Sequence, residues 1–142
     1  MTQEDKELLL KDLCARLPYG VVIRTWYGKR INTKCISVDV YTNAVGLDIP
    51  EDDDAKVFID NVKPYLFPLS RLNSLTDEQK KTLKVLCDWN DEEADAQSIL
   101  VLYQKHFVMK TDVIDWLNKN HFDYRGLIEK GLANDATGLN IY

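Results

Sequence analysis

The chain has 142 residues, a length at which one domain can bury about two thirds of the surface that the unfolded chain exposes. Hydrophobic residues make up 45% of it and charged residues 29%, as in an ordinary globular protein. The net charge of −5 excludes the strongly basic composition by which many proteins hold the phosphate backbone of nucleic acid. We therefore expect a single domain over residues 1–142 and do not expect nucleic acid as its main partner.

Many of the acidic residues are gathered in two runs. Residues 51–54 read EDDD, and residues 88–95 hold a second group of carboxylates. Such runs are usually solvated loops, and we favour that interpretation over calcium binding or mimicry of phosphate toward a basic partner. A calcium loop of the EF-hand type needs alternating ligands and a central glycine, which EDDD lacks. We expect neither a metal nor a cofactor.

The three cysteines, Cys14, Cys35 and Cys87, are odd in number and far apart in the sequence. A disulfide framework would be denser, and a zinc site would show close pairs of Cys or His. Cys14 and Cys87 fall on the apolar faces of predicted helices, so we expect both to be buried and to behave as small hydrophobic residues. The acidic start of the chain, MTQEDKELLLKD, resembles neither a signal peptide nor a membrane span, which predicts a cytoplasmic protein with no membrane partner.

The first predicted element is a helix over residues 1–17. Thr2 can cap it, and acidic residues follow in the first turn, where the helix dipole favours them. Pro18-Tyr19-Gly20 is expected to end it. The apolar residues at helical spacing are Leu10, Leu13, Cys14 and Leu17.

Residues 20–69 are predicted to be rich in β-structure. Ile36, Val38 and Val40 alternate with polar residues, the period of a half-buried strand, and Asn43 is a plausible hairpin corner. Pro64 and Pro68 should confine the end of this region to a sheet edge or to irregular structure. Short strands joined by tight loops favour a small antiparallel β-meander or an SH3-like barrel. The expected strands are 21–27, 35–41, 45–49 and 55–60, followed by an extended tail over 61–67 that could add a fifth.

Residues 75–132 are predicted to be helical. Thr76 and Gln79 have the spacing of a capping box, and residues 92–107 favour a helix over a buried strand. Thr111 is expected to cap the next helix. Asp123 should cap a last short one that ends at a left-handed Gly131, with residues 133–142 as a loosely held tail. The predicted fold class is α+β, with an N-terminal helix, the β-rich part and C-terminal helices.

Three segments resemble a family of uncharacterised proteins found in gut Bacteroidales genomes, prophages and other mobile elements. They are KELLLKDLCARLPYGV near the start, KPYLFPLS in the middle and DWLNKNHFDYRGLIEKGLA near the end. Together they cover roughly half of the chain. The resemblance implies an origin in a phage or mobile element, and it carries over no catalytic or binding residues.

Residues able to perform catalysis are few and form no known pattern. The two histidines, His106 and His121, do not form a metal-binding pair, and cysteines on apolar faces are poor sources of thiolate. The glycines are not grouped as in a phosphate-binding loop. We expect no catalytic residues, no metal site and no enzymatic activity.

The first hairpin is a candidate nucleic-acid or nucleotide site, because it combines cations with aromatic residues. The alternative, which we favour from the sequence, is that Trp26 belongs to the core while the charges solvate a turn. The residues concerned are Arg24, Trp26, Tyr27, Lys29, Arg30 and Lys34.

Residues 115–132 form the second candidate site. Their spacing predicts a helical corner held by aromatic residues, with Asn118 on the outside and His121, Tyr124 and Arg125 on an exposed rim. Aromatic residues and arginine are favoured at binding hot spots, so this rim is our candidate docking site. The leading hypothesis is a non-enzymatic protein-protein binding module of phage or mobile-element origin acting on a host protein. The alternatives are a small-barrel protein binding nucleic acid or a nucleotide, and a counter-defence protein that sequesters a signalling nucleotide.

Overall fold

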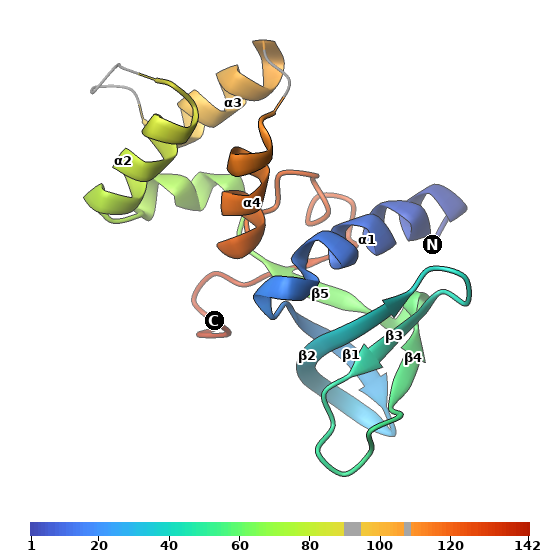
Figure 1. Ribbon diagram of the computed structural model, residues 1–142. Helices are drawn as coiled ribbons and strands as arrows, with labels where there is room; N and C mark the ends of the chain where they lie inside the picture. Colours follow the sequence, from blue (N-terminus) through green and yellow to red (C-terminus); the bar gives the residue numbers. More distant parts are fainter. Residues whose placement is uncertain (90–94, 107–108) are drawn as a thin grey trace. The chain divides into compact units, whose positions relative to one another are not determined.

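A computed structural model describes residues 1–89, 95–106 and 109–142. It contains an N-terminal helix, a six-stranded, mostly antiparallel sheet and C-terminal helices, so the predicted α+β class is confirmed (Figure 1). The chain divides into two compact units. Unit 1 comprises residues 1–66 and 125–142, and unit 2 comprises residues 67–124.

Helix α1 (Gln3–Arg16) begins where the sequence predicts. The Thr2 hydroxyl accepts a hydrogen bond from the Asp5 amide, and the Asp5 carboxylate accepts one from the Thr2 amide. This reciprocal pair satisfies two amides that a helix start leaves without partners. The helix passes into a 3₁₀ turn, Leu17–Tyr19, which Gly20 ends in the left-handed conformation at φ 71°.

In the sheet of unit 1, β1 to β4 form an antiparallel meander, β5 pairs with β1 on its other side, and β6 adds to β5 in parallel. The strand order is β4-β3-β2-β1-β5-β6, and only β6 pairs in parallel. A 3₁₀ turn connects β4 to β5, but within the described residues no ladder joins these two strands, so the predicted meander is confirmed for β1 to β4 and the sheet does not close into a barrel. The strands are β1 (Val22–Tyr27), β2 (Lys29–Asp39), β3 (Ala44–Leu47), β4 (Lys56–Phe58), β5 (Lys63–Leu66) and β6 (Asn134–Asp135).

Two expectations about the strands are wrong. Ile36 and Val40, predicted to alternate into the core, are each 52% exposed, whereas Cys35 is buried. The ladder between β2 and β3 shifts register between Cys35 and Ser37, and such an irregularity changes which side chains face the core. The segment that contains Pro64 is not at the edge, because β5 lies between β1 and β6. The hairpin corner at Asn43 is confirmed, with φ 55°.

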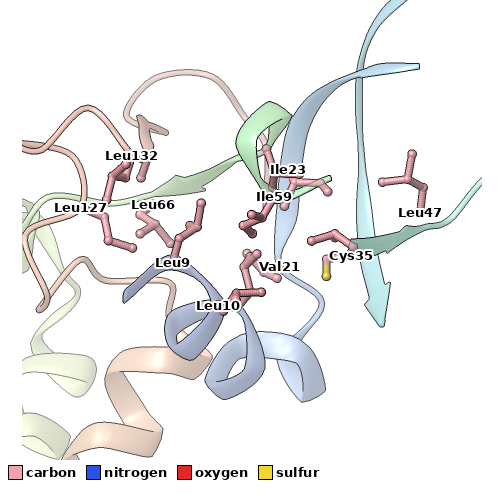
Figure 2. Packing of buried hydrophobic residues seen from close by; sticks show 14 of the residues in the cluster. Leu9, Leu10, Val21, Ile23, Cys35, Leu47, Ile59, Leu66, Leu127 and Leu132 are labelled. Carbon is pink, nitrogen blue, oxygen red and sulfur yellow. The ribbon is translucent and has the colours of Figure 1, made fainter. Parts of the chain in front are cut away.

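The core of unit 1 is built from α1, the inner face of the sheet and the C-terminal segment (Figure 2). Leu10 and Leu13 are buried as predicted, together with Leu9. Cys14 is exposed, contrary to expectation, because the buried stripe of α1 runs through Leu9, Leu13 and Arg16. The residues labelled in Figure 2 are Leu9, Leu10, Val21, Ile23, Cys35, Leu47, Ile59, Leu66, Leu127 and Leu132.

A buried carboxylate ties α1 to the C-terminal segment. Asp12 is fully buried and accepts hydrogen bonds from Arg16 Nε at 2.8 Å and from Arg125 Nη1 at 2.9 Å. Arg16 is also fully buried, and the Arg125 side chain is 16% exposed. A carboxylate taken out of water needs such partners, because an isolated buried charge is very costly.

The C-terminal segment differs from its prediction in two ways. The helix expected after Asp123 is a single turn, because Gly126 adopts φ 73° and interrupts it. That turn ends at Gly131 as predicted: the Gly131 amide bonds to Ile128 O, and the Leu132 amide bonds to Leu127 O. The residues beyond are not a loose tail, since β6 pairs with β5.

Unit 2 is helical. The capping box of Thr76 and Gln79 is confirmed. The helix predicted at 92–107 is confirmed over α3. Of its other residues, only Asp95 lies within the described ranges. Lys110, and not Thr111, is the N-cap of α4, and its side chain makes no capping bond. Phe122 stacks on Trp116, with ring centroids 5.8 Å apart. The elements are a 3₁₀ helix (Leu69–Ser74), α2 (Asp77–Leu86), α3 (Ala96–His106) and α4 (Thr111–Lys119).

We predict that Arg125→Ala destabilises the protein. The substitution leaves the buried Asp12 carboxylate with one arginine in place of two. A hydrogen bond to a charged group contributes about 1.5–3 kcal/mol, so the free energy of unfolding should fall by about 2 kcal/mol in urea denaturation. The control is Lys11→Ala, which removes an exposed cation from α1, the helix of Asp12, and should change stability by less than about 0.5 kcal/mol. Equal stability of the two variants would contradict the structural role of Arg125.

Candidate functional site

The rim predicted at residues 118–125 is not an exposed surface. His121 is 7% exposed and Asn118 is 2% exposed, whereas both were expected outside. His121 adopts φ 61° and reverses the chain after α4, which turns its side chain away from solvent. Tyr124, which is half-buried, donates a hydrogen bond to Asn118 Oδ1 at 3.0 Å, and Arg125 is engaged by Asp12. The sequence pattern thus identified residues that hold the fold together.

The first hairpin has a different character, because its two arginines lie on the outer face of the sheet. Side chains alternate between the two faces of a strand, and paired residues share a face. Ile23 faces the core, so Arg24 and Trp26 face outward, as does Arg30, the partner of Trp26. Trp26 is 62% exposed and is not the core residue that we expected. Lys29 pairs with Tyr27 and belongs to the other face.

Two further residues that the sequence did not indicate join this face. Lys63 of β5 is the cross-strand partner of Arg24. Asn134 of β6 is the partner of Tyr65, which shares the alternation of Lys63. Both come from segments far from the hairpin in the sequence, and only the pairing of the strands brings them to it.

These residues line a concave pocket of about 340 Å³ in unit 1. The volume is within the range of small-molecule sites. The pocket lies where β1 and β5 separate, since the ladder between them ends at Arg24 and Lys63. Its lining consists of Arg24, Thr25, Trp26, Arg30, Asp60, Asn61, Lys63 and Asn134.

The pocket gathers positive charge without compensating it. In the described part of the chain, the side chains of Arg24, Arg30 and Lys63 form no ion pair or hydrogen bond. The carboxylate of the lining, Asp60, pairs with Lys6 at 3.1 Å. Asn134 adds a buried amide nitrogen, Nδ2, which donates no hydrogen bond to a described residue. The lining therefore offers several donors and no free carboxylate.

The last residue of the chain holds β1 and β5 together beside this pocket. The Val22 amide donates to the Tyr142 hydroxyl at 3.1 Å, and that hydroxyl donates to Tyr65 O at 2.7 Å. The phenol thus bridges the Val22 amide of β1 and the Tyr65 carbonyl of β5. Burial raises the pKa of Tyr142 to about 12, so the hydroxyl keeps the proton that it donates.

The chemistry of the pocket is that of binding an anion and a planar group. Guanidinium and ammonium groups bind phosphate or carboxylate, and an exposed indole offers a stacking surface. The buried thiols lie elsewhere, and burial raises the pKa of Cys35 to about 12 and of Cys87 to about 11, which disfavours thiolate at neutral pH. The described residues contain no group of three or more His, Cys, Asp or Glu side chains arranged to hold a metal ion.

Comparison with known proteins adds no assignment to this geometry. No protein-family model, curated protein or solved structure matches the chain. Among the helices in the described ranges, none has the length and apolar character needed to cross a membrane.

We predict that Tyr142→Phe destabilises the protein at pH 7 by about 1–2 kcal/mol, since it removes both hydrogen bonds of the hydroxyl. An unfolded phenol loses its proton near pH 10, while the folded one holds it to about 12. The native protein should therefore lose this contribution as pH rises from about 10 to 12, and the variant should lack that loss.

Thermal unfolding at pH 7, 9 and 11 measures both effects. Tyr41→Phe is the matched control, because Tyr41 is 96% exposed. If Tyr142→Phe and Tyr41→Phe behave alike at every pH, the bridging role of Tyr142 is wrong.

Proposed function

We propose that the protein is a non-enzymatic nucleotide-binding protein. In this proposal the phosphate of the ligand lies among Arg24, Arg30 and Lys63, and its base stacks on Trp26. The observation that carries it is an exposed indole together with three cations that have no ion pair among the described residues, all around one pocket of an acidic chain.

Placing Arg24, Arg30 and Lys63 around one pocket costs electrostatic free energy. The chain has 23 acidic and 18 basic side chains, so carboxylates are plentiful, yet none pairs with these three cations in the described residues. Like charges placed together repel, and the repulsion is relieved when an anion binds. Arginine is suited to phosphate, because its planar fork can donate two parallel hydrogen bonds.

The exposed Trp26 indole offers a stacking surface for a base. Trp26 exposes 62% of its surface although it lies in a strand that is otherwise half-buried or buried. Stacking of a base on an aromatic side chain contributes about 1–3 kcal/mol. The amides of Asn61 and Asn134 can supply hydrogen bonds to a base edge or a sugar, and the buried Asn134 nitrogen would gain a partner that it lacks among the described residues.

The proposal corresponds to two alternatives predicted from the sequence, nucleotide binding and sequestration of a signalling nucleotide. A protein that binds a nucleotide without converting it acts by sequestering one ligand molecule per binding site. The resemblance to phage and mobile-element proteins is compatible with that mode of action, and counter-defence is the form of the proposal that it favours.

Protein binding, the leading hypothesis from the sequence, is the second candidate. The observation in its favour is a set of exposed apolar side chains near the β2–β3 turn and on β4, namely Val40, Tyr41 and Phe58. It would gain support if Tyr41→Ser with Phe58→Ser abolished a stoichiometric complex that Trp26→Ala leaves intact. The reverse pattern would remove this candidate.

We predict that nucleotides bind in calorimetric titration at low salt and that substitutions in the pocket weaken them. Arg24→Gln, Lys63→Gln and Trp26→Ala should each reduce affinity roughly tenfold, as expected for about 1–2 kcal/mol per contact. Lys11→Gln changes the net charge equally at a distant, exposed position and serves as the control.

The test should use mononucleotides and cyclic dinucleotides carrying each of the bases, with inorganic phosphate alongside. If none of the nucleotides binds, or if the pocket variants bind as the control does, the proposed function is wrong. Thermal shifts should confirm that every variant is folded, since these side chains are on the outer face and are expected to contribute little to stability.

A further inference from the structure

The positive charge of the outer face continues beyond the pocket along β1 and β2. Residues that pair across these strands share a face, and every second pair is on the outer one. The outward pairs are Trp26 with Arg30, Arg24 with Asn32, and Val22 with Lys34. Each outward pair forms one level of the face, and Lys63 joins the middle level, that of Arg24 and Asn32, because it pairs with Arg24. Successive levels are two residues, or about 7 Å, apart.

Lys34 does not line the pocket, but it extends the row of cations on the same face. It is exposed and forms no ion pair or side-chain hydrogen bond with a described residue. Asp48 follows β3, and its amide donates to Lys34 O, but its carboxylate makes no ion pair with Lys34. The distance from the Trp26 level to the Lys34 level is about 13 Å, which is beyond the reach of one phosphate held in the pocket.

From this arrangement we infer that the natural ligand is a short single-stranded oligonucleotide that lies along the outer face of β1 and β2. One base stacks on Trp26, and phosphates of the strand lie beside Arg30, beside Arg24 with Lys63, and beside Lys34. At the 3.4 Å spacing of a stacked strand, a 13 Å track accommodates about four nucleotides. This inference rests on the proposed function and specifies the ligand class of the same site.

A single strand is favoured over a duplex by the shape of this face. An exposed indole with cations beside it is the pattern by which proteins hold unpaired bases and their backbone without reading sequence. The bases of a duplex are stacked on one another and offer no free face to Trp26. The acidity of the whole chain limits contact to the few phosphates within this track.

The test is a length series of one base, from the mononucleotide to the octanucleotide, titrated at several salt concentrations. Affinity should rise up to about four nucleotides and then level off. Three phosphate positions predict a slope of log affinity against log salt of about −2.1, at about −0.7 per phosphate for single strands.

Lys34→Gln separates this inference from the proposed function. It should weaken the tetranucleotide severalfold and reduce the size of its salt slope by about 0.7, while leaving mononucleotide affinity unchanged. Lys29→Gln is the matched control, because it removes the same charge from the hairpin end on the other face, and it should leave both ligands unchanged. A duplex of the same length should bind more weakly than the single strand.

The outcomes are distinct. Equal affinity for the mononucleotide and the tetranucleotide, with no effect of Lys34→Gln, would overturn the oligonucleotide and leave the nucleotide site standing. Tighter binding of the duplex would also overturn the inference. Absence of binding at every length, or binding insensitive to Trp26→Ala, would overturn the proposed function itself.

Discussion

The buried carboxylate of Asp12 is the constraint on which unit 1 depends. A charge with no access to water must be neutralised by close partners, and α1 supplies only one of them, Arg16. The other, Arg125, is 113 residues away in the sequence, so the chain must return to α1 after the helical unit is complete. That return buries Leu127 and Leu132, places β6 beside β5 and brings Tyr142 to the Val22 amide. The return of the chain to the buried Asp12 carboxylate therefore also brings Asn134 into the lining of the pocket.

Local signals in the sequence predict local structure well in this protein. The cap at Thr2, the capping box at Thr76, the hairpin corner at Asn43 and the left-handed Gly131 need only a few neighbouring residues, and all four are confirmed. The cap expected at Thr111 is a local signal that is wrong. Larger errors arise where distant segments decide the outcome. The phase of β2 depends on a register shift against β3, and the exposure of Cys14 depends on which stripe of α1 meets the sheet. No window of sequence contains that information.

The candidate site was predictable in part for the same reason. Arg24 and Arg30 stand out within one hairpin, but Lys63 and Asn134 join them only through the pairing of β5 with β1 and β6. The sequence favours Trp26 as a core residue, whereas strand alternation from the buried Ile23 places it on the outer face. The net charge of −5 is a sum over the whole chain, so it does not reveal a face where cations lie without acidic partners among the described residues. Arg125, by contrast, has the residue type of a hot spot but is committed to Asp12.

The central claim is that the outer face of β1, β2 and β5 binds a nucleotide ligand. Amide chemical shifts recorded during titration of the isotope-labelled protein with a tetranucleotide test it most directly, because they report the location of contact independently of any substitution. Saturable shifts concentrated at Arg24, Trp26, Arg30 and Lys63, together with the Trp26 indole, are the predicted result, with α2 and α4 unaffected. Saturable shifts confined to residues 67–124, or no saturable shift at millimolar ligand, would contradict the account.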